Sequence, residues 1–181
     1  MRADNQQERL GKLNPWYITG FVEGEGTFHV AFYRDPKTKF GIKIIPEFHV
    51  NQSYLRINTL EEIKNYFGCG YIKENNQNKA SDTTYVYVVR NRDDLKNKII
   101  PFFEEYPLLS VKQESFEKFS QIVKDMAGGK HKTKEGIKAI IAKAYEMNNK
   151  GRYRRIDKNR LFNSLKSSET ICQTPPKAEK I

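Results

Sequence analysis

The sequence predicts an α+β domain built around an antiparallel sheet. Its hydrophobic patterns follow one another in the order helix, two strands, helix, two strands and then further helices. Polar segments at residues 35–39 and 75–82 separate the strands of each pair, as hairpin turns require. Hairpins join antiparallel neighbours, and no segment repeats another, so we expect one sheet with its helices in one domain.

The first predicted helix covers residues 15–25. Asn14 is a side chain that caps a helix N-terminus, and Pro15 is favoured at the first helical position. Gly26 follows the last helical residue, where a left-handed cap is often needed. We therefore expect the helix to end at Gly26 with that conformation.

Two strands follow at residues 27–34 and 40–52. In the first strand, Phe28, Val30 and Phe32 alternate with His29, Ala31 and Tyr33. In the second strand, one face carries Ile42, Ile44, Phe48 and Val50, and the other carries Lys43, Ile45, Glu47 and His49. Pro46 lies on the apolar face and predicts a bend or a bulge there.

The remaining elements are a helix at 54–67, strands at 71–74 and 83–90, and several helices. In the strand at 83–90 we expect Val86 and Val88 to point inward and Tyr85 and Tyr87 outward. Helical spacing continues at 93–100, and Pro101 then breaks or restarts the helix. Two longer helices are expected around 116–126 and 137–145, with a basic loop at 128–134 between them. The predicted units are an N-terminal arm (1–13), a domain (14–150), a basic extension (151–166) and a disordered tail (167–181).

Composition favours a polyanionic partner. The chain has 32 basic and 22 acidic residues, a net charge of +10, which favours nucleic acid. Cys69 and Cys172 suit unpaired thiols in a reducing compartment, and the three histidines lack zinc-ligand spacing. No apolar run approaches the ~20 residues of a membrane span, and the N-terminus resembles no secretory signal. We therefore expect an intracellular, non-secreted protein.

The first helix carries the most informative residues. Gly20 and Gly24 share a face and leave it nearly bare, although each glycine costs ~1 kcal/mol in a helix. Close approach of a second helix would explain them. Glu25 lies at the carbonyl end of the helix dipole, where a bound Mg²⁺ would neutralise its charge. On spacing alone, a plainer alternative is favoured, in which the glycines pack on a strand and Glu25 is solvated.

The segment from Ile18 to Gly26, Ile-Thr-Gly-Phe-Val-Glu-Gly-Glu-Gly, resembles the LAGLIDADG motif of homing endonucleases. The predicted element order resembles the family's αββαββα core over residues 14–126. Further similarities are the strand ending Phe-His-Val-Asn-Gln at 48–52 and Val-Lys-Gln at 111–113. Glu23 and Glu25 stand where the family usually has aspartate, which lengthens the carboxylate arm without removing it.

The resemblance implies a divalent-metal-dependent DNA endonuclease. One motif in 181 residues implies a homodimer, joined through motif helices at positions matching Gly20, Gly24, Thr19 and Glu23. Glu25 and the carbonyl of Gly24 match the metal ligands. Gln52 and Arg56 match residues that order solvent around the attacking water, and Lys112 matches the lysine near the reacting phosphate. Mg²⁺ is the expected ion, Mn²⁺ an expected substitute, and Ca²⁺ is expected to support binding without cleavage.

The outward face of the sheet is the expected DNA-reading surface, because a two-stranded ribbon fits the major groove. The expected base-reading side chains are His29, Tyr33, Lys43, Glu47, His49, Lys73, Tyr85 and Tyr87. Phosphate contacts are expected from Arg34, Lys37, Lys39, Lys130 and Lys132, and also from Arg152, Arg154 and Arg155. A dimer predicts a pseudo-palindromic site.

Two other functions fit the same fold. An intron RNA maturase would use a similar basic surface, and a DNA-binding regulator would bind without cleaving. The presence of Glu25, Gln52 and Lys112 favours cleavage and hence intron homing over the regulator.

Overall fold

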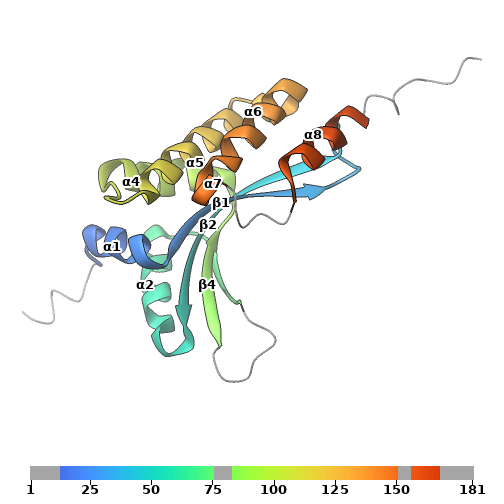
Figure 1. Cartoon of the computed structure of the whole chain (residues 1–181). Coiled ribbons are helices and arrows are strands. Elements are labelled where there is room, and N and C mark those ends of the chain that lie inside the picture. The colour runs from blue at the N-terminus through green and yellow to red at the C-terminus, as the bar shows by residue number, and fades with distance from the viewer. Residues whose placement is uncertain (1–12, 76–82, 151–155, 168–181) are drawn as a thin grey trace, which may run out of the picture.

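The computed structural model describes residues 13–75, 83–150 and 156–167 (Figure 1). Most of the predicted arm and tail, and the three arginines at 152, 154 and 155, lie outside the described residues. The elements in chain order are α1 (Pro15–Glu25), β1 (Gly26–Arg34), β2 (Ile42–Ser53), the 3₁₀ turn η2 (Tyr54–Arg56), α2 (Ile57–Phe67), β3 (Tyr71–Glu74), β4 (Thr84–Val89), α3 (Arg92–Asp94), the π-helical η3 (Leu95–Ile99), α4 (Ile100–Glu105), α5 (Lys112–Ala127), the 3₁₀ turn η4 (Lys130–Lys132), α6 (Lys134–Tyr145), α7 (Met147–Lys150) and α8 (Lys158–Ser167). The α+β prediction is confirmed.

The four strands form one antiparallel sheet in the order β1-β2-β4-β3. Strands β1 and β2 pair in an unbroken register from Gly26 opposite Val50 to Arg34 opposite Ile42. The bulge predicted at Pro46 is therefore absent. Because β4 pairs with β2 only from residue 48 onward, Pro46 lies where β2 has a free edge, and proline is tolerated on such edges.

The helices gather on one side of this sheet and leave the other side open (Figure 1). Phe28 of β1 and Phe48 of β2 are fully buried and stack at 5.3 Å between ring centroids. Both rings contact Phe103 of α4, and Phe28 also contacts Phe116 and Phe119 of α5. This aromatic cluster fixes α4 and α5 over the centre of the sheet.

Strand β4 has the opposite orientation to the predicted one. Val89 lies opposite Phe48, and Tyr87 lies opposite Val50, so Tyr87 faces the helices and is fully buried. Val86 and Val88 lie on the face away from the helices, although both are buried there. The prediction was wrong because both faces of β4 carry large apolar side chains, and only the register with β2 decides which face is covered.

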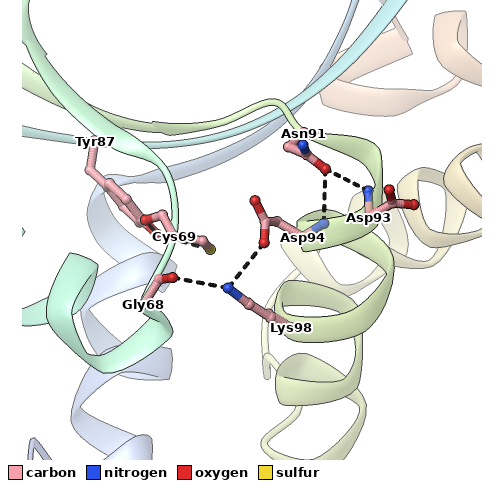
Figure 2. A network of polar contacts seen from close by, with 7 residues as sticks. All are labelled: Gly68, Cys69, Tyr87, Asn91, Asp93, Asp94 and Lys98. Carbon is pink, nitrogen blue, oxygen red and sulfur yellow. Dashed lines mark hydrogen bonds and ion pairs between the residues drawn. The ribbon is translucent and has the colours of Figure 1, made fainter.

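Tyr87 fastens the turn between α2 and β3 to strand β4, and Lys98 ties the same turn to the helix that starts at Arg92 (Figure 2). Its hydroxyl donates to the carbonyl of Cys69 at 3.0 Å, and burial raises the pKa of Tyr87 far above its ordinary value. Lys98 of η3 donates to the neighbouring carbonyl of Gly68 at 2.9 Å and pairs with Asp94 at 3.0 Å. The network ties the α2–β3 turn to α3 and η3.

Helix α1 begins after Asn14 and ends before Gly26, and the structure shows the role of each of these two residues. The side chain of Asn14 accepts from the backbone N–H of Trp16 at 2.9 Å, which confirms the predicted cap. Gly26 is not left-handed, because its φ is −89° and its ψ 155°. The reason for glycine is space: a Cβ at Gly26 would lie 2.4 Å from Cγ1 of Val22.

The C-terminal helices complete the same core. Pro101 restarts the helix as expected, since it lies in the first turn of α4, directly after η3, where its missing N–H costs least. Leu161 and Leu165 of α8 are buried in the core cluster, and α8 contacts α6. Within the described residues, no helix is long and apolar enough to span a membrane.

Candidate active site and nucleic-acid interface

Helix α1 has one side that packs within the chain. Thr19 is buried, and its hydroxyl donates to the carbonyl of Tyr106 at 3.0 Å. The carboxylate of Glu23 accepts hydrogen bonds from the backbone N–H groups of Leu109 and Ser110 and from the Ser110 hydroxyl. Thr19 and Glu23 were predicted at the dimer interface, but both bond to the loop before α5. These bonds show that both side chains hold the loop within one chain, and their place at a dimer interface stays a prediction.

The bonds to Glu23 also affect its titration. Burial raises the pKa of the Glu23 carboxyl, but the hydrogen bonds from Ser110 and Leu109 lower it more. The net result is a pKa below the ordinary glutamate value, so Glu23 stays charged as a fixed acceptor.

The opposite side of α1 is open. A Cβ placed on Gly20 or Gly24 would meet no atom within 4 Å. Trp16 and Tyr17 on the same helix are 54% and 48% exposed. Within the described residues, the two glycines therefore serve no close contact, and the alternative in which they pack against a strand of the chain is excluded.

Glu25 ends α1 beside this open side. Its side chain is exposed and makes no hydrogen bond or ion pair within the described part of the chain. The carbonyl of Gly24 precedes it at the end of the helix. A carboxylate and a carbonyl oxygen are ligands that Mg²⁺ accepts, so these two groups can supply part of a coordination shell.

Lys112, the first residue of α5, holds the end of α1 in place. Its ammonium donates to the carbonyl oxygens of Val22, Glu23 and Gly26, each at 2.7 Å. These bonds use all three N–H donors of the lysine. Lys112 thus neutralises the carbonyl end of the helix dipole, and leaves the Gly24 carbonyl out of its set. Burial lowers the pKa of Lys112, although the charges of Glu23 and Glu25 act in the opposite direction.

Gln52 and Arg56 lie at the same end of the sheet as Glu25. Gln52 is two residues beyond Val50, the residue opposite Gly26, and its side-chain oxygen accepts from the N–H of Ser53 at 2.8 Å. Arg56 ends the exposed turn η2. In the described ranges, no group of three or more His, Cys, Asp or Glu side chains could hold a metal. Within the described residues, one copy of the chain thus offers no cluster of three such ligands around Glu25.

The open face of the sheet carries most of the predicted DNA-reading side chains. In the register of β1 with β2, His29 lies opposite Glu47 and Tyr33 lies opposite Lys43. His49 is on the same face of β2 as Glu47, and Lys73 of β3 lies opposite Val86. Tyr33, Lys43 and Lys73 are exposed. Tyr85 and Tyr87 lie on the side of the sheet that the helices cover. Their prediction as DNA-reading residues was wrong, because the orientation of β4 is opposite to the predicted one.

Glu47 is buried in this face and cannot read bases directly as predicted. Only 4% of the residue is exposed, and it pairs with Arg90 at 2.6 Å and with His49 at 3.0 Å. Burial raises its pKa, but the two partners, together with His29, lower it more, so the net pKa is below the ordinary glutamate value. Glu47 therefore orients two hydrogen-bond donors on the open face.

The sequence prediction missed Arg90. It follows β4 directly and shares the alternation of Val86 and Val88, so a correct assignment of that strand would have found it. Its guanidinium lies 5.9 Å from the centre of the Tyr71 ring. The predicted phosphate contacts within the described residues are all exposed: Arg34, Lys37, Lys39, Lys130 and Lys132. Lys130 also pairs with Asp125 at 2.8 Å.

Comparison with known proteins agrees with this geometry. The family model described as LAGLIDADG endonuclease matches residues 18–123. A probable intron-encoded endonuclease of Neurospora crassa is 36% identical over 137 residues, which are 75% of this chain and 29% of that protein. The chain spans less than a third of the length of the first curated relatives that it matches.

Solved structures show the same fold. The homing endonuclease I-TnaI has a TM-score of 0.74 and 36% identity, with coverage of 87% of this chain and 99% of that chain. The archaeal intron-encoded homing endonuclease I-Vdi141I, complexed with DNA, has a TM-score of 0.77 and 30% identity, with coverage of 90% of this chain and 99% of that chain. The meganuclease I-SmaMI, bound to uncleaveable DNA, has a TM-score of 0.71 and 29% identity, with coverage of 76% of this chain and 46% of that chain. Because the family model matches more than half of the chain and the fold is shared, the chain belongs to the LAGLIDADG endonuclease family.

Proposed function

We propose that this protein is a homing endonuclease that cuts both strands of a long DNA site, as a homodimer that depends on a divalent metal. The observation that carries the proposal is the open side of α1. That side combines two glycines with no neighbour of their own, and it ends in Glu25, an exposed carboxylate without a partner in the described residues.

The homodimer follows from symmetry. Two copies of α1 related by a twofold axis can approach closely at Gly20 and Gly24, which brings two Glu25 carboxylates to one place. The described residues of one copy form no cluster of three His, Cys, Asp or Glu ligands, so the pair would add a carboxylate that the single chain does not supply. The chain also matches about half of the I-SmaMI chain, as expected if two copies take the place of one longer chain.

The residues around Glu25 fit phosphodiester hydrolysis. A bound Mg²⁺ would activate the attacking water and stabilise the leaving oxygen. Glu25 and the Gly24 carbonyl would hold the ion, and Gln52 and Arg56 would order solvent beside it. Lys112 fixes the helix end that presents both ligands, through its bonds to three neighbouring carbonyls. We therefore assign Lys112 first to positioning, in place of direct contact with the phosphate.

The open sheet face is the proposed DNA surface. Its donors are preorganised, since Glu47 holds Arg90 and His49 in place, and preorganised donors suit base reading in the major groove. The structures of I-Vdi141I and I-LtrWI are complexes with DNA, and one structure of I-SmaMI is bound to uncleaved target DNA in the presence of calcium ions. These complexes support DNA as the partner, and the calcium complex with uncleaved DNA supports Ca²⁺ as an ion for binding without cutting. Mg²⁺ as the working ion is proposed from the ligand types of Glu25 and the Gly24 carbonyl. The names of several relatives support an intron as the coding location.

The test compares the wild type with Glu25→Gln and a control, Glu62→Gln, which changes an exposed carboxylate on α2. Each protein is incubated with a randomised duplex library with Mg²⁺ or with EDTA, and the cut ends are sequenced. We expect staggered cuts at one near-palindromic sequence for wild type and Glu62→Gln with Mg²⁺ alone. Specific retention without cutting would replace the proposal by a DNA-binding regulator. No selection of DNA by a folded dimer would redirect the search to intron RNA.

A further inference from the structure

A pocket of about 770 Å³ opens at the free edge of β2. It lies where β4 has ended, because β4 pairs with β2 only from residue 48 onward. One wall comes from β2 and the hairpin before it. The facing wall comes from Arg92 of α3, from His131 and Lys132 of η4, and from residues of α5 and α6. The pocket borders the open sheet face through Lys43 and Arg90, which belong to both.

The charged residues that line this pocket are all basic. Six of its lining residues are basic or histidine, and none is acidic: Lys39, Lys43, Arg90, Arg92, His131 and Lys132. Arg90 has its counterion in Glu47. For Arg92 and Lys132, the described residues provide no carboxylate within ion-pair distance. An anion in the pocket would therefore gain attraction without displacing a carboxylate.

Two of these groups already converge on one point. A guanidinium nitrogen of Arg92 lies 3.5 Å from Nε2 of His131. Only a neutral imidazole can accept a hydrogen bond from arginine at that nitrogen. Burial lowers the pKa of His131, and the charges of Arg92 and Lys132 lower it further. An anion between the two side chains would reverse this effect and favour the protonated ring.

The backbone holds both sides of this junction. Asn91 caps the helix that begins with Arg92 by accepting from two backbone N–H groups, and Lys98 ties the next turn to Gly68 (Figure 2). On the other side, Gly129 turns the chain with a φ of +82°, and Thr133 caps α6. The pocket is thus preorganised, which reduces the entropy that a ligand must overcome.

The floor of the pocket is apolar, with contributions from Ile42, Ile44, Pro46, Met126 and Ile137. Inorganic phosphate alone would leave this floor unused. A deoxyribose presents an apolar C–H face with a phosphate on each side, which suits a floor without hydrogen-bond groups below a basic rim. A ribose would place its 2′-hydroxyl against side chains that cannot bond to it, and that burial is unfavourable.

We propose that this pocket binds one deoxyribose–phosphate unit of a DNA backbone, with the phosphate at Arg92, His131 and Lys132 and the sugar on the apolar floor. DNA as the source of that unit rests on the proposed function. The pocket would anchor one strand beside the sheet, and so would add affinity and register without reading a base.

The test uses 2′-deoxyuridine 3′,5′-diphosphate as the probe, so that it does not depend on a cleavage site and differs from its uridine counterpart only at the sugar. NMR of the histidine ring protons follows His131, with His29 and His49 as internal references. We expect the probe to shift the His131 resonance and to raise its pKa, against the surrounding charges of Arg92, Lys132, Lys39, Lys43 and Arg90. Uridine 3′,5′-diphosphate should bind several-fold more weakly.

The matched variants are Arg92→Ala and Lys96→Ala. Each removes one exposed positive charge, but Lys96 does not line the pocket. Arg92→Ala should weaken probe binding about tenfold, as expected for a lost charge-assisted hydrogen bond, and Lys96→Ala should not. An unmoved His131 resonance, or equal effects of the two variants, would overturn the proposal. Equal binding of the uridine probe would overturn the assignment of the sugar. A protein that cuts no DNA but binds the probe as expected refutes the proposed function and leaves the pocket intact.

Discussion

Replacing Glu47 by glutamine tests whether the buried carboxylate organises the open face of the sheet. Glutamine keeps the shape of the side chain and removes its charge. Glu47 is 4% exposed, whereas the side chains of Arg90 and His49 are 44% and 25% exposed. Breaking a fully buried pair costs about 3–5 kcal/mol, and an exposed pair contributes about 0–1 kcal/mol. Because the partners of Glu47 reach solvent, we expect a loss of about 1–2 kcal/mol.

The assay is chemical unfolding at several pH values, with thermal unfolding alongside. For a domain of this size, the expected loss corresponds to a fall in Tm of about 2–8 °C. Although burial raises the pKa of Glu47, hydrogen bonding and the charges of His49 and Arg90 outweigh burial, so the folded state lowers that pKa below its ordinary value. The stabilisation is therefore fully present above the unfolded pKa and is lost as the pH falls through the folded pKa. The difference between wild type and variant should be largest near pH 7 and should shrink below about pH 4.5.

The control is Glu104→Gln, which removes a carboxylate paired with Lys124 at 2.7 Å but 49% exposed. Its effect should stay below about 0.5 kcal/mol, because exposed pairs contribute little. Equal losses for the two variants, or a difference for Glu47→Gln that persists unchanged to low pH, would refute the reasoning. DNA selection by the variant should also become less specific, since Arg90 and His49 lose the acceptor that orients them.

Three further predictions follow from the motif helix and the core. Lys112→Met should lower the unfolding free energy by about 1–3 kcal/mol in denaturant titrations, because three carbonyls lose a charged donor, while Lys118→Met on the same helix should change it by less than about 0.5 kcal/mol. Gly24→Leu should leave the monomer folded, since a Cβ there meets nothing within 4 Å, but should abolish the dimer in sedimentation analysis; a stable dimer would contradict the interface. Tyr87→Phe should cost about 1–2 kcal/mol in the same titrations, because the carbonyl of Cys69 loses its donor, and an unchanged midpoint would show that solvent replaces it.

Local patterns in the sequence were sufficient for most of the secondary structure. The spacing of Phe28, Val30 and Phe32 indicated both the strand and its buried face, because the opposite positions are more polar. Asn14 and Pro15 marked the start of α1, because a capping side chain and a fixed φ act within a few residues. Signals of this kind are local, so the sequence shows them directly.

The errors arose where two distant segments decide the outcome together. The buried face of β4 depends on which residue lies opposite Val50, and both faces of β4 are apolar. The glycine at position 26 is required by the approach of Val22, not by a left-handed cap. The bonds of Thr19 and Glu23 to the loop at residues 106–110 went unpredicted for the same reason.

The amino-acid sequence was sufficient to identify the class of the protein, from a motif helix with Gly20, Gly24 and Glu25, paired strands and an excess of basic residues. The tertiary structure decided how those residues are used. It showed that Lys112 donates to the end of the motif helix and that Glu47 is buried beneath two donors. It also showed that Arg92 and His131 meet at a pocket although they are 39 residues apart. The reason is physical: a helix or a strand follows from neighbouring residues, whereas burial and hydrogen-bond partners depend on which distant segments pack together.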